Sequence, residues 1–383
     1  MMKKVLALLI ALCTVFTLAA CNRETPTPSP SPTQSAQPTG PAMEDISKNE
    51  NSIGFFSSGV DPASRKTYNV VWAYMRPMAL FQNIADALVR LEPVLNFKTT
   101  SYCANGDIDA MIQNIQIYAS QNVDGFLVVI DPTAADRVKE VLDETNIPYI
   151  AMLNSVRDEN GSAIVPCVGI EGVIAGEKVT QWLYDNYKTY WGDIDPSEIA
   201  LLDYNFSPNV DFNDRYTGAM NKFKELLPNN KVFTADGVSG KLDEQTGYDL
   251  ASAILAANPD VKYWFVPACL ELYAQGCTRA VETLGMEDKV LITCVGSDIL
   301  TAEWDNGYEG CWVSCLAISD LQYTVPGICG LVAMMDGKAT ADSLWSYRRA
   351  EGDQKTFYNI LNEMVTKDTY KDFLARVQSE SGL

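Results

Sequence analysis

Short apolar runs alternate with segments of helical periodicity along most of this chain, and this alternation constrains the fold more than any other feature. From Tyr68 onward, ten runs have the length and composition of strands. Several are apolar almost throughout, as strands buried on both faces of a parallel sheet are. The predicted strands are residues 68–74, 96–102, 123–130, 147–153, 163–170, 198–204, 231–236, 261–268, 289–296 and 311–318.

Helical patterns fill the gaps between these runs. Apolar side chains recur at helical spacing in residues 79–92, and again in residues 107–121 behind Asp107, which can cap a helix. Further helices are predicted at 133–145, 173–189, 212–227, 243–258, 271–285 and 320–336. Because ten strands in one open sheet would be large, the pattern predicts an α/β protein of two doubly wound parallel-sheet lobes. Ligands of such sheets bind beyond the carboxyl ends of the strands.

The N-terminal residues have the pattern of a secretory signal. Two lysines precede an apolar run that ends in Leu18-Ala19-Ala20-Cys21. The run is shorter than the roughly 20 residues that a membrane span takes. Small residues before a cysteine resemble the bacterial lipobox, so we predict a lipoprotein signal peptide at 1–20 and lipidation of Cys21, which would anchor the protein outside the cytoplasm. The alternative is an ordinary cleaved signal in which Cys13 and Cys21 are incidental.

The segment after Cys21 has the composition of a linker. Residues 22–50 contain six prolines among Ser, Thr and Gln, with hardly an apolar side chain. Such a segment cannot bury enough apolar surface to fold, and alternating prolines favour an extended chain of about 3.1 Å per residue. We therefore predict that residues 21–50 are a lipidated, disordered spacer between the membrane and the folded part.

Composition excludes several classes of function. The chain has 49 acidic and 29 basic residues, a net charge of −20, which argues against nucleic-acid binding. It contains no histidine, which removes Ser-His-Asp and Cys-His catalysis and imidazole metal sites. Nucleotide-binding, metalloprotease and EF-hand motifs are also absent, so we expect no enzyme, no metal and no cofactor. A surface hydrolase that uses paired carboxylates is the alternative from another class.

Eight cysteines follow Cys21, and most of them lie inside apolar runs, where cysteine behaves as a small buried apolar residue. There is no Cys-x-x-Cys pair. Cys311 and Cys315 are four residues apart in a predicted strand, hence about 13 Å apart and unable to bond each other. We expect mostly free thiols, although an even number outside the cytoplasm also permits disulfides.

Six phrases of the sequence, in order over about residues 68–340, resemble the type I periplasmic sugar-binding proteins, the family of the ribose- and galactose-binding proteins of ABC importers. Each phrase is weak alone, and their order and spacing carry the resemblance. The phrases are Asn122–Pro132, Asn146–Ile150, Val168–Gly176, Asn213–Gly218, Val295–Asp298 and Asp336–Lys338.

This resemblance implies two similar lobes, joined by about three crossing strands at a hinge, that close around a sugar. It implies an N-terminal lobe of residues 51–171 completed by 316–342, and a C-terminal lobe of 172–315 completed by 343–383. The implied function is capture of a sugar or sugar-like molecule by a monomer and delivery to an ABC permease and its ATPase. A receptor of the same fold that senses a signal molecule or nucleoside is the alternative.

In the first lobe, the family's ligand contacts fall on loops after the strands. The resemblance and the strand ends together predict contacts from Tyr74, Arg76, Phe81, Asn105, Asp131 and Asn154. Phe81 has a core helix residue as its alternative role, and Asp131 a support of its loop. Asn154 departs from the family, which commonly has an Arg or Asp there.

In the second lobe, the resemblance predicts ligand contacts from Asn213, Arg215, Glu271 and Asp298. Asp298 matches the aspartate of a family phrase whose preceding phenylalanine is Ser297 here. Arg215 has salt-bridging as its alternative role. Before Glu271, the asparagine of the family's Asn-Asp pair is missing, which leaves that contact open.

The last 40 residues depart further from the family. We expect a short strand at Ser343–Arg349 and then a helical extension over Thr356–Val377, where apolar side chains recur at helical spacing. Packing of this extension on one lobe is favoured over a role in docking the permease.

Overall fold

The computed structural model describes residues 59–239 and 241–381, and the predicted signal peptide, Cys21 and linker lie outside them. Its architecture is two six-stranded sheets with helices on both faces of each, which confirms the predicted α/β fold of two parallel-sheet lobes. In the described residues, no helix combines the length and apolar character that a membrane crossing needs.

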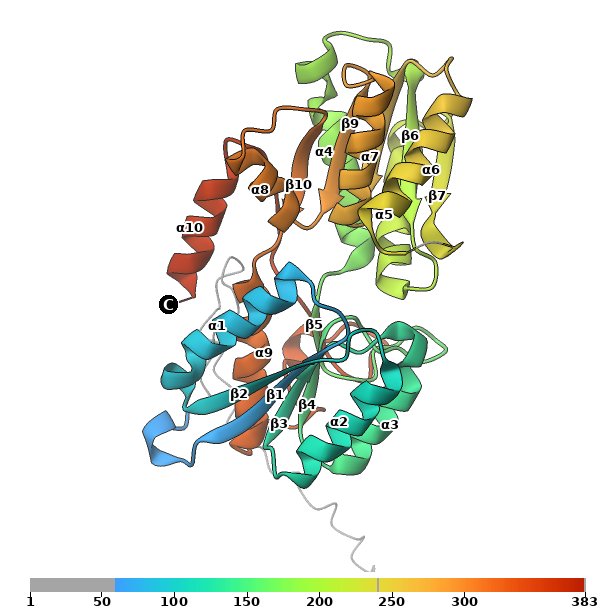
Figure 1. Ribbon diagram of the computed structural model, residues 1–383. Helices are drawn as coiled ribbons and strands as arrows, with labels where there is room; N and C mark the ends of the chain where they lie inside the picture. The colour runs from blue at the N-terminus through green and yellow to red at the C-terminus, as the bar shows by residue number, and fades with distance from the viewer. Residues whose placement is uncertain (1–58, 240, 382–383) are drawn as a thin grey trace, which may run out of the picture. The chain divides into compact units, whose positions relative to one another are not determined.

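The sheet of the first lobe is parallel throughout, in the order β11-β5-β4-β3-β1-β2. Figure 1 shows α1 and α9 on one side of this sheet and α2 and α3 on the other. The strands are β1 (Tyr68–Tyr74), β2 (Phe97–Cys103), β3 (Gly125–Val128), β4 (Tyr149–Leu153), β5 (Cys167–Gly169) and β11 (Phe357–Asn359). The helices are α1 (Ala79–Leu95), α2 (Ile108–Ser120), α3 (Ala135–Thr145) and α9 (Asp320–Met335).

Alternation along the strands of the first lobe feeds a core on each face. Trp72 of β1 packs in the cluster shared with α1 and α9, whereas Val71 packs in the cluster shared with α2 and α3. Because successive side chains of a strand point to opposite faces, burial on both faces requires nearly continuous apolar strands. This requirement explains why the apolar runs located these strands.

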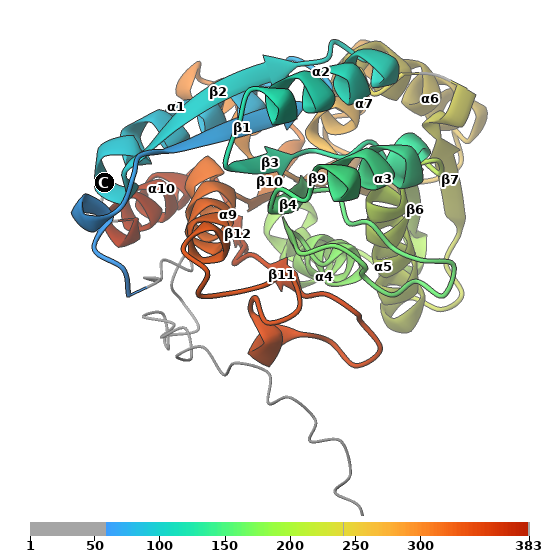
Figure 2. The same cartoon turned by 90° about the horizontal axis from the view of Figure 1, so that it is seen from below.

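The second lobe has the order β12-β10-β9-β8-β6-β7, in which β12 alone among the described strands runs antiparallel to its neighbour. Figure 2 shows α4 and α5 on one side of the sheet and α6 and α7 on the other. Its strands are β6 (Ile199–Asn205), β7 (Val232–Asp236), β8 (Tyr263–Ala268), β9 (Val290–Val295), β10 (Trp312–Ala317) and β12 (Glu363–Val365). Its helices are α4 (Gly172–Trp191), α5 (Val210–Leu226), α6 (Glu244–Ala257), α7 (Glu271–Leu284), α8 (Asp298–Asp305) and α10 (Tyr370–Glu380).

The chain passes between the two sheets three times. It leaves β5 for α4, returns from β10 to α9, and crosses once more between β11 and β12. Each sheet is therefore completed by a late segment of the chain. We expected residues 343–383 to complete the second lobe. That expectation is wrong for residues 343–359, because β11 pairs with β5 of the first sheet.

The C-terminal residues correct two further predictions. Residues 346–348 form a 3₁₀ helix instead of the expected strand, and the expected helix over Thr356–Val377 is replaced by β11, β12 and the later helix α10. Short apolar runs fit the periodicity of a helix or of a strand. Here β11 and β12 pair with the edges of the two sheets instead of forming a helix. The helix α8 was not among the predicted helical ranges, since its eight residues are few for a periodic signal.

All eight cysteines of the described residues are free, in line with the expectation of mostly free thiols. Seven are buried, and Cys103 is partly exposed. Burial raises the pKa of the Cys311 thiol to about 12, so this thiol is unreactive at neutral pH.

Candidate functional site

The loops after β1 and β2 are held together by backbone hydrogen bonds at the carboxyl edge of the first sheet. The amide of Ala104 donates to the Tyr74 carbonyl at 2.8 Å, and that of Gly106 donates to the Met75 carbonyl at 2.6 Å. Gly106 has φ +86°, and a Cβ there would lie 3.7 Å from Nη1 of Arg76. A Cβ at that distance would only touch the arginine, so it is the positive φ that favours glycine here.

Arg76 and Asn105 are both exposed at this edge. Within residues 59–239 and 241–381, no carboxylate forms an ion pair with Arg76, so its guanidinium is available to a ligand. Asn105 has a left-handed backbone, φ 53°, and its Oδ1 accepts a weak hydrogen bond from the Cys103 thiol at 3.4 Å.

The structure places Tyr74 and Phe81 in an aromatic cluster under this edge. Their ring centroids are 5.5 Å apart, and Phe81 also meets Trp72 edge-on at 6.1 Å. Phe81 is 6% exposed and Tyr74 is 9% exposed. These rings therefore support the loop of Arg76 from the core side.

Asp131 and Asn154 brace the loops after β3 and β4. Oδ1 of Asp131 accepts from the Thr133 amide at 2.9 Å and from its hydroxyl at 2.6 Å, which caps a short 3₁₀ helix. Nδ2 of Asn154 donates to the Ile130 carbonyl at 3.0 Å. Within the part of the chain described, Oδ1 of Asn154 keeps no protein donor and can accept from a ligand.

In the second lobe, Asn205 at the end of β6 is a polar residue that the sequence analysis missed. Its Nδ2 donates to Oδ1 of Asn213 on α5 at 3.1 Å. Its own Oδ1 is buried without a hydrogen-bond partner among the described residues. The sequence offered no signal beyond its place after the last residue of the predicted strand 198–204.

Arg215, two residues after Asn213 on α5, is held at the edge of the same sheet. Nη1 donates to the carbonyl of Cys269, just after β8, at 2.9 Å, and the guanidinium lies over the Phe212 ring at 5.0 Å. Nε is buried and has no partner in the described residues. An unpartnered buried donor is unfavourable, so it would gain from a ligand acceptor.

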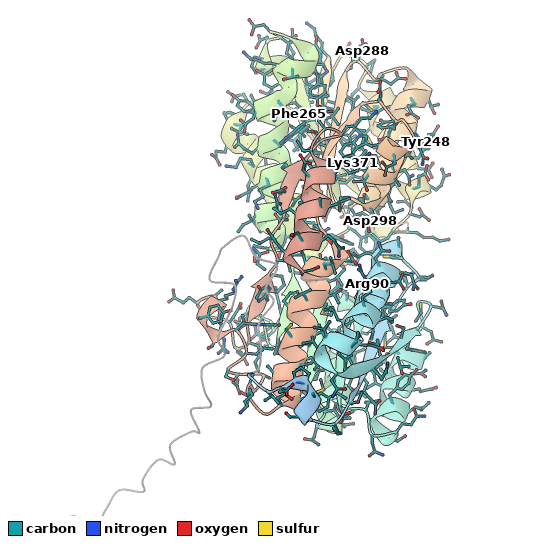
Figure 3. All side chains as sticks on the ribbon, turned by 90° about the vertical axis from the view of Figure 1, so that its left-hand side faces the viewer. Arg90, Tyr248, Phe265, Asp288, Asp298 and Lys371 are labelled. Carbon is teal, nitrogen blue, oxygen red and sulfur yellow. The ribbon has the colours of Figure 1, made fainter. Side chains whose placement is uncertain are left out.

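Glu271 and Asp298 lie together after β8 and β9. The Glu271 carboxyl accepts three hydrogen bonds from backbone amides at the start of α8, including the amide of Asp298. Burial, together with the charge of Asp320, raises the pKa of Asp298 to about 6. Asp320 in turn forms an ion pair with Arg90 of α1 at 3.5 Å. Figure 3 shows Asp298 at the end of its lobe toward Arg90.

Two segments of opposite lobes meet beside these edges. The Ser155 amide, after β4, donates to Oδ2 of Asp211 on α5 at 3.2 Å, and its hydroxyl donates to Oδ1 at 2.9 Å. Nε of Arg157 donates to the same hydroxyl oxygen at 3.1 Å. This contact joins the loop of Asn154 to the helix of Asn213.

The chemistry of this arrangement is that of hydrogen bonding. Amide, guanidinium and carboxyl groups project from the carboxyl ends of both sheets, and the thiols nearby are buried except that of Cys103, which is partly exposed. Across residues 59–239 and 241–381, no three side chains gather in a way that could hold a metal ion. Groups that each bond two hydroxyls suit a polyol.

A comparison with protein families identifies this fold. The sequence model of the periplasmic binding protein domain matches residues 78–306, more than half of the chain. The chain belongs to the periplasmic binding protein family. The predicted resemblance to type I periplasmic sugar-binding proteins is thereby confirmed, and the family implies a location outside the cytoplasm.

Among curated relatives, this periplasmic binding protein is 26% identical over 213 residues to the ABC transporter L-arabinose-binding periplasmic protein of Azospirillum brasilense. The match covers 53% of this chain and 60% of that relative, so it spans less than two thirds of the relative's length.

Solved structures share the fold at low sequence identity. An ABC transporter solute-binding protein of Actinobacillus succinogenes with bound D-allose has a TM-score of 0.64 and 14% identity, covering 80% of this chain and 100% of that one. The Caulobacter myo-inositol-binding protein also has a TM-score of 0.64, with 16% identity over 81% of this chain and 97% of that one. These likenesses establish the two-lobed architecture.

Proposed function

We propose that this periplasmic binding protein captures a sugar or sugar-like molecule between its lobes and delivers it, chemically unchanged, to an ABC importer. The observation that carries the proposal is the set of polar groups at the carboxyl edges of both sheets. Arg76 and Asn154 keep free groups in the first lobe, and Asn205 and Arg215 do so in the second.

The physical basis is the surface of a polyol. A sugar presents a ring of hydroxyls that each donate and accept, so its site needs amides, an arginine fork and a carboxylate that each bond more than one hydroxyl. Buried polar groups that lack partners also reject molecules that cannot pair with them. Among these groups, Asp298 is the carboxylate that we assign to the ligand, and it needs its charge to accept two hydroxyls.

The cellular setting of this proposal comes from the N-terminal sequence. A lipid on Cys21 and the proline-rich linker would hold a monomer at the outer face of the cell membrane, within reach of a permease and its ATPase. A relative named for L-arabinose, a structural neighbour with bound D-allose and one named for myo-inositol support a sugar or cyclitol as ligand.

Isothermal titration calorimetry of the detergent-solubilised protein with pentoses, hexoses and inositols tests the proposal. One ligand should bind and be recovered unchanged. Asp298→Ala should weaken its binding at least a hundredfold while the circular dichroism spectrum stays that of the wild type. Asp288→Ala, an exposed aspartate of the same lobe (Figure 3), should change nothing.

The same titration has an expected pH dependence. Because the pKa of Asp298 is raised to about 6, the carboxylate is protonated below that pH and loses one acceptor. Affinity should therefore fall as the pH is lowered through 6. A wild type that binds no polyol, or an Asp298→Ala variant with unchanged affinity, would contradict the proposed function.

A further inference from the structure

Glu271 is a site residue whose hydrogen-bonding capacity is already used within the protein. Its Oε2 accepts from the Asp298 amide at 3.2 Å, and its Oε1 accepts from the amides of Ile299 at 2.8 Å and Leu300 at 3.2 Å. These are the first three residues of α8. The glutamate of α7 therefore caps the amino end of another helix.

This cap replaces the local one that α8 lacks. Ser297 stands at the N-cap position, yet its side chain makes no capping hydrogen bond and donates instead to the Ile318 carbonyl at 3.1 Å. The first amides of a helix need acceptors from outside it. Without Glu271, these amides would lose their acceptor, and the first turn that carries Asp298 would fray.

The loop before α8 is shaped to admit this glutamate. Gly296 has φ +111°, and a Cβ there would lie only 2.9–3.1 Å from the Glu271 side chain. Both the backbone conformation and the close approach require glycine. The Glu271 carboxyl group is thus held between Gly296 on one side and the first amides of α8 on the other.

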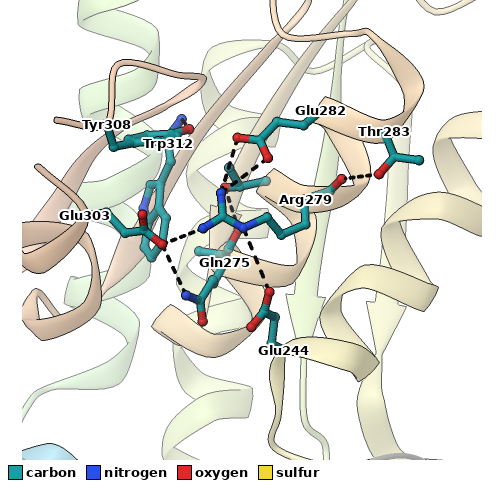
Figure 4. Close-up of polar contacts among 10 residues, drawn as sticks. Glu244, Gln275, Arg279, Glu282, Thr283, Glu303, Tyr308 and Trp312 are labelled. Carbon is teal, nitrogen blue, oxygen red and sulfur yellow. Dashed lines mark hydrogen bonds and ion pairs between the residues drawn. The ribbon is translucent and has the colours of Figure 1, made fainter. Parts of the chain in front are cut away.

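The far end of α8 is held by the same helix α7 (Figure 4). Arg279 forms an ion pair with Glu303 of α8 at 2.5 Å, and Nε2 of Gln275 donates to the same carboxylate at 3.4 Å. Since α7 binds α8 at both ends, the two helices form one support. The direction of the Asp298 side chain depends on that support.

We propose that Glu271 is a positioning residue for ligand binding, which holds the first turn of α8 so that the Asp298 carboxylate faces the ligand. This inference rests on the proposed function, because it assigns Asp298 to the ligand. It differs from the family-based expectation, in which Glu271 would contact the ligand itself.

The charge state of Glu271 makes a conservative replacement available. Burial and the charge of Asp298 raise the pKa of Glu271 to about 8, although the three amide hydrogen bonds oppose this. Near neutral pH the cap is then largely protonated and uncharged. A glutamine adds no charge and keeps the Oε1 that accepts from Ile299 and Leu300, but its Nε2 cannot accept from the Asp298 amide.

The test compares Glu271→Ala with Glu271→Gln in the full-length protein. Affinity for the sugar that the wild type binds is measured by calorimetry, and exchange of the Asp298, Ile299 and Leu300 amides is measured without ligand by deuterium-exchange mass spectrometry. Glu271→Ala should weaken binding at least tenfold and speed exchange at these amides. Glu271→Gln should restore most of the affinity and the slow exchange of the Ile299 and Leu300 amides, whereas the Asp298 amide, whose acceptor is lost, should still exchange faster than in the wild type. Glu282→Ala, an outer partner of Arg279 on α7, should match the wild type.

Other outcomes would overturn the inference. If Glu271→Ala binds like the wild type, α8 needs no cap to present Asp298. If Glu271→Gln binds as weakly as Glu271→Ala while its Ile299 and Leu300 amides stay protected, the glutamate contacts the ligand directly. A wild type that binds no sugar overturns the proposed function and the positioning role together, whereas a failure confined to the Glu271 variants overturns the positioning role alone.

Discussion

At the scale of single residues, Asp203 is a carboxyl group buried beside an apolar core. It lies on β6 with no exposed surface, and neither carboxyl oxygen makes a well-formed hydrogen bond among the described residues, although the nearby Tyr204 amide partly offsets the effect of burial on its pKa. Leu201, two residues before it on the same strand face, packs in the apolar core between the sheet and α4 and α5. Burial raises the pKa of Asp203 well above its usual range, so the folded protein keeps this carboxyl protonated.

This predicts a pH-dependent effect of Asp203→Asn on stability. The unfolded chain ionises the carboxyl above its ordinary pKa, whereas the folded protein does not, so the wild type loses stability as the pH rises from that value toward the folded pKa. The free energy of unfolding of Asp203→Asn relative to the wild type should therefore increase with pH, by about 1.4 kcal/mol per pH unit in that range. Urea unfolding between pH 4 and pH 7 measures this slope.

Asp249→Asn serves as the control for this experiment, since Asp249 is an exposed aspartate of α6. Its difference from the wild type should stay flat over the same pH range. A flat difference for Asp203→Asn as well would mean that the buried carboxyl is ionised and has found a partner.

Residue roles in the site were only partly predictable from the sequence. Strand ends and family phrases located Arg76, Asn213 and Asp298 at the carboxyl edges of the sheets. They could not reveal that Glu271 is occupied by three amides, because those amides come from a helix 27 residues later in the sequence. They also missed Asn205, whose free Oδ1 is a matter of packing and not of local pattern.

At the scale of elements, α4 and α5 pack with their backbones in close contact. A Cβ on Gly176 of α4 would lie 1.9 Å from the Arg215 carbonyl oxygen, and one on Gly218 of α5 would lie 2.0 Å from the Val173 carbonyl oxygen. Each helix thus has a glycine at the point where the backbone of the other helix comes closest. Since Asn213 and Arg215 lie on α5, this packing also sets where they stand relative to the sheet.

We expect Gly176→Ala to lower the free energy of unfolding by at least about 2 kcal/mol, because the methyl group must push two backbones apart. The displacement of α5 should also weaken sugar binding. Thermal unfolding and calorimetry measure the two effects. Ile174→Ala, an exposed residue of the same helix, should change either quantity little. Wild-type stability in Gly176→Ala would show that the helices separate without cost.

Element types followed from the sequence wherever a long periodic segment stood between two apolar runs. The predicted helix at 320–336 became α9, Asp320–Met335, and the predicted strand at 68–74 became β1 with the same bounds. The prediction of a helix over Thr356–Val377 was wrong, because residues 357–359 and 363–365 pair with strands far away in the sequence. Pairing of this kind is set by which sheet edges are open, and local periodicity does not record it.

At the scale of the whole molecule, the contact of Ser155 with Asp211 joins the two lobes. Ser155 is 4% exposed and Asp211 is 5% exposed, so both hydrogen bonds between them are shielded from water. Burial raises the pKa of Asp211, while the bonds from Ser155 and the charge of Arg215 oppose this. The contact lies between the loop after β4 and helix α5, one from each lobe, and both carry side chains that we assign to the ligand. It can therefore influence how readily the lobes close.

Ser155→Ala should affect both stability and binding. It removes the hydroxyl that serves Asp211 and Arg157, and the loss leaves a buried carboxyl oxygen without its donor, which costs about 1–3 kcal/mol. If the contact also restrains the lobes, its loss raises the share of molecules whose lobes stand apart. The apparent affinity for the sugar then decreases in proportion to the fraction of molecules that remain competent to bind.

Small-angle X-ray scattering separates these two effects in the ligand-free protein. For Ser155→Ala we expect a larger radius of gyration, a lower melting temperature and weaker sugar binding than for the wild type. Ser162→Ala, in the same loop but outside this contact, should match the wild type in all three. A lower melting temperature with an unchanged radius of gyration and unchanged affinity would mean that the contact stabilises its own surroundings and leaves lobe closure alone. Since the two hydrogen bonds connect helix α5 to the loop after β4, a change in all three quantities would identify them as part of the machinery of closure.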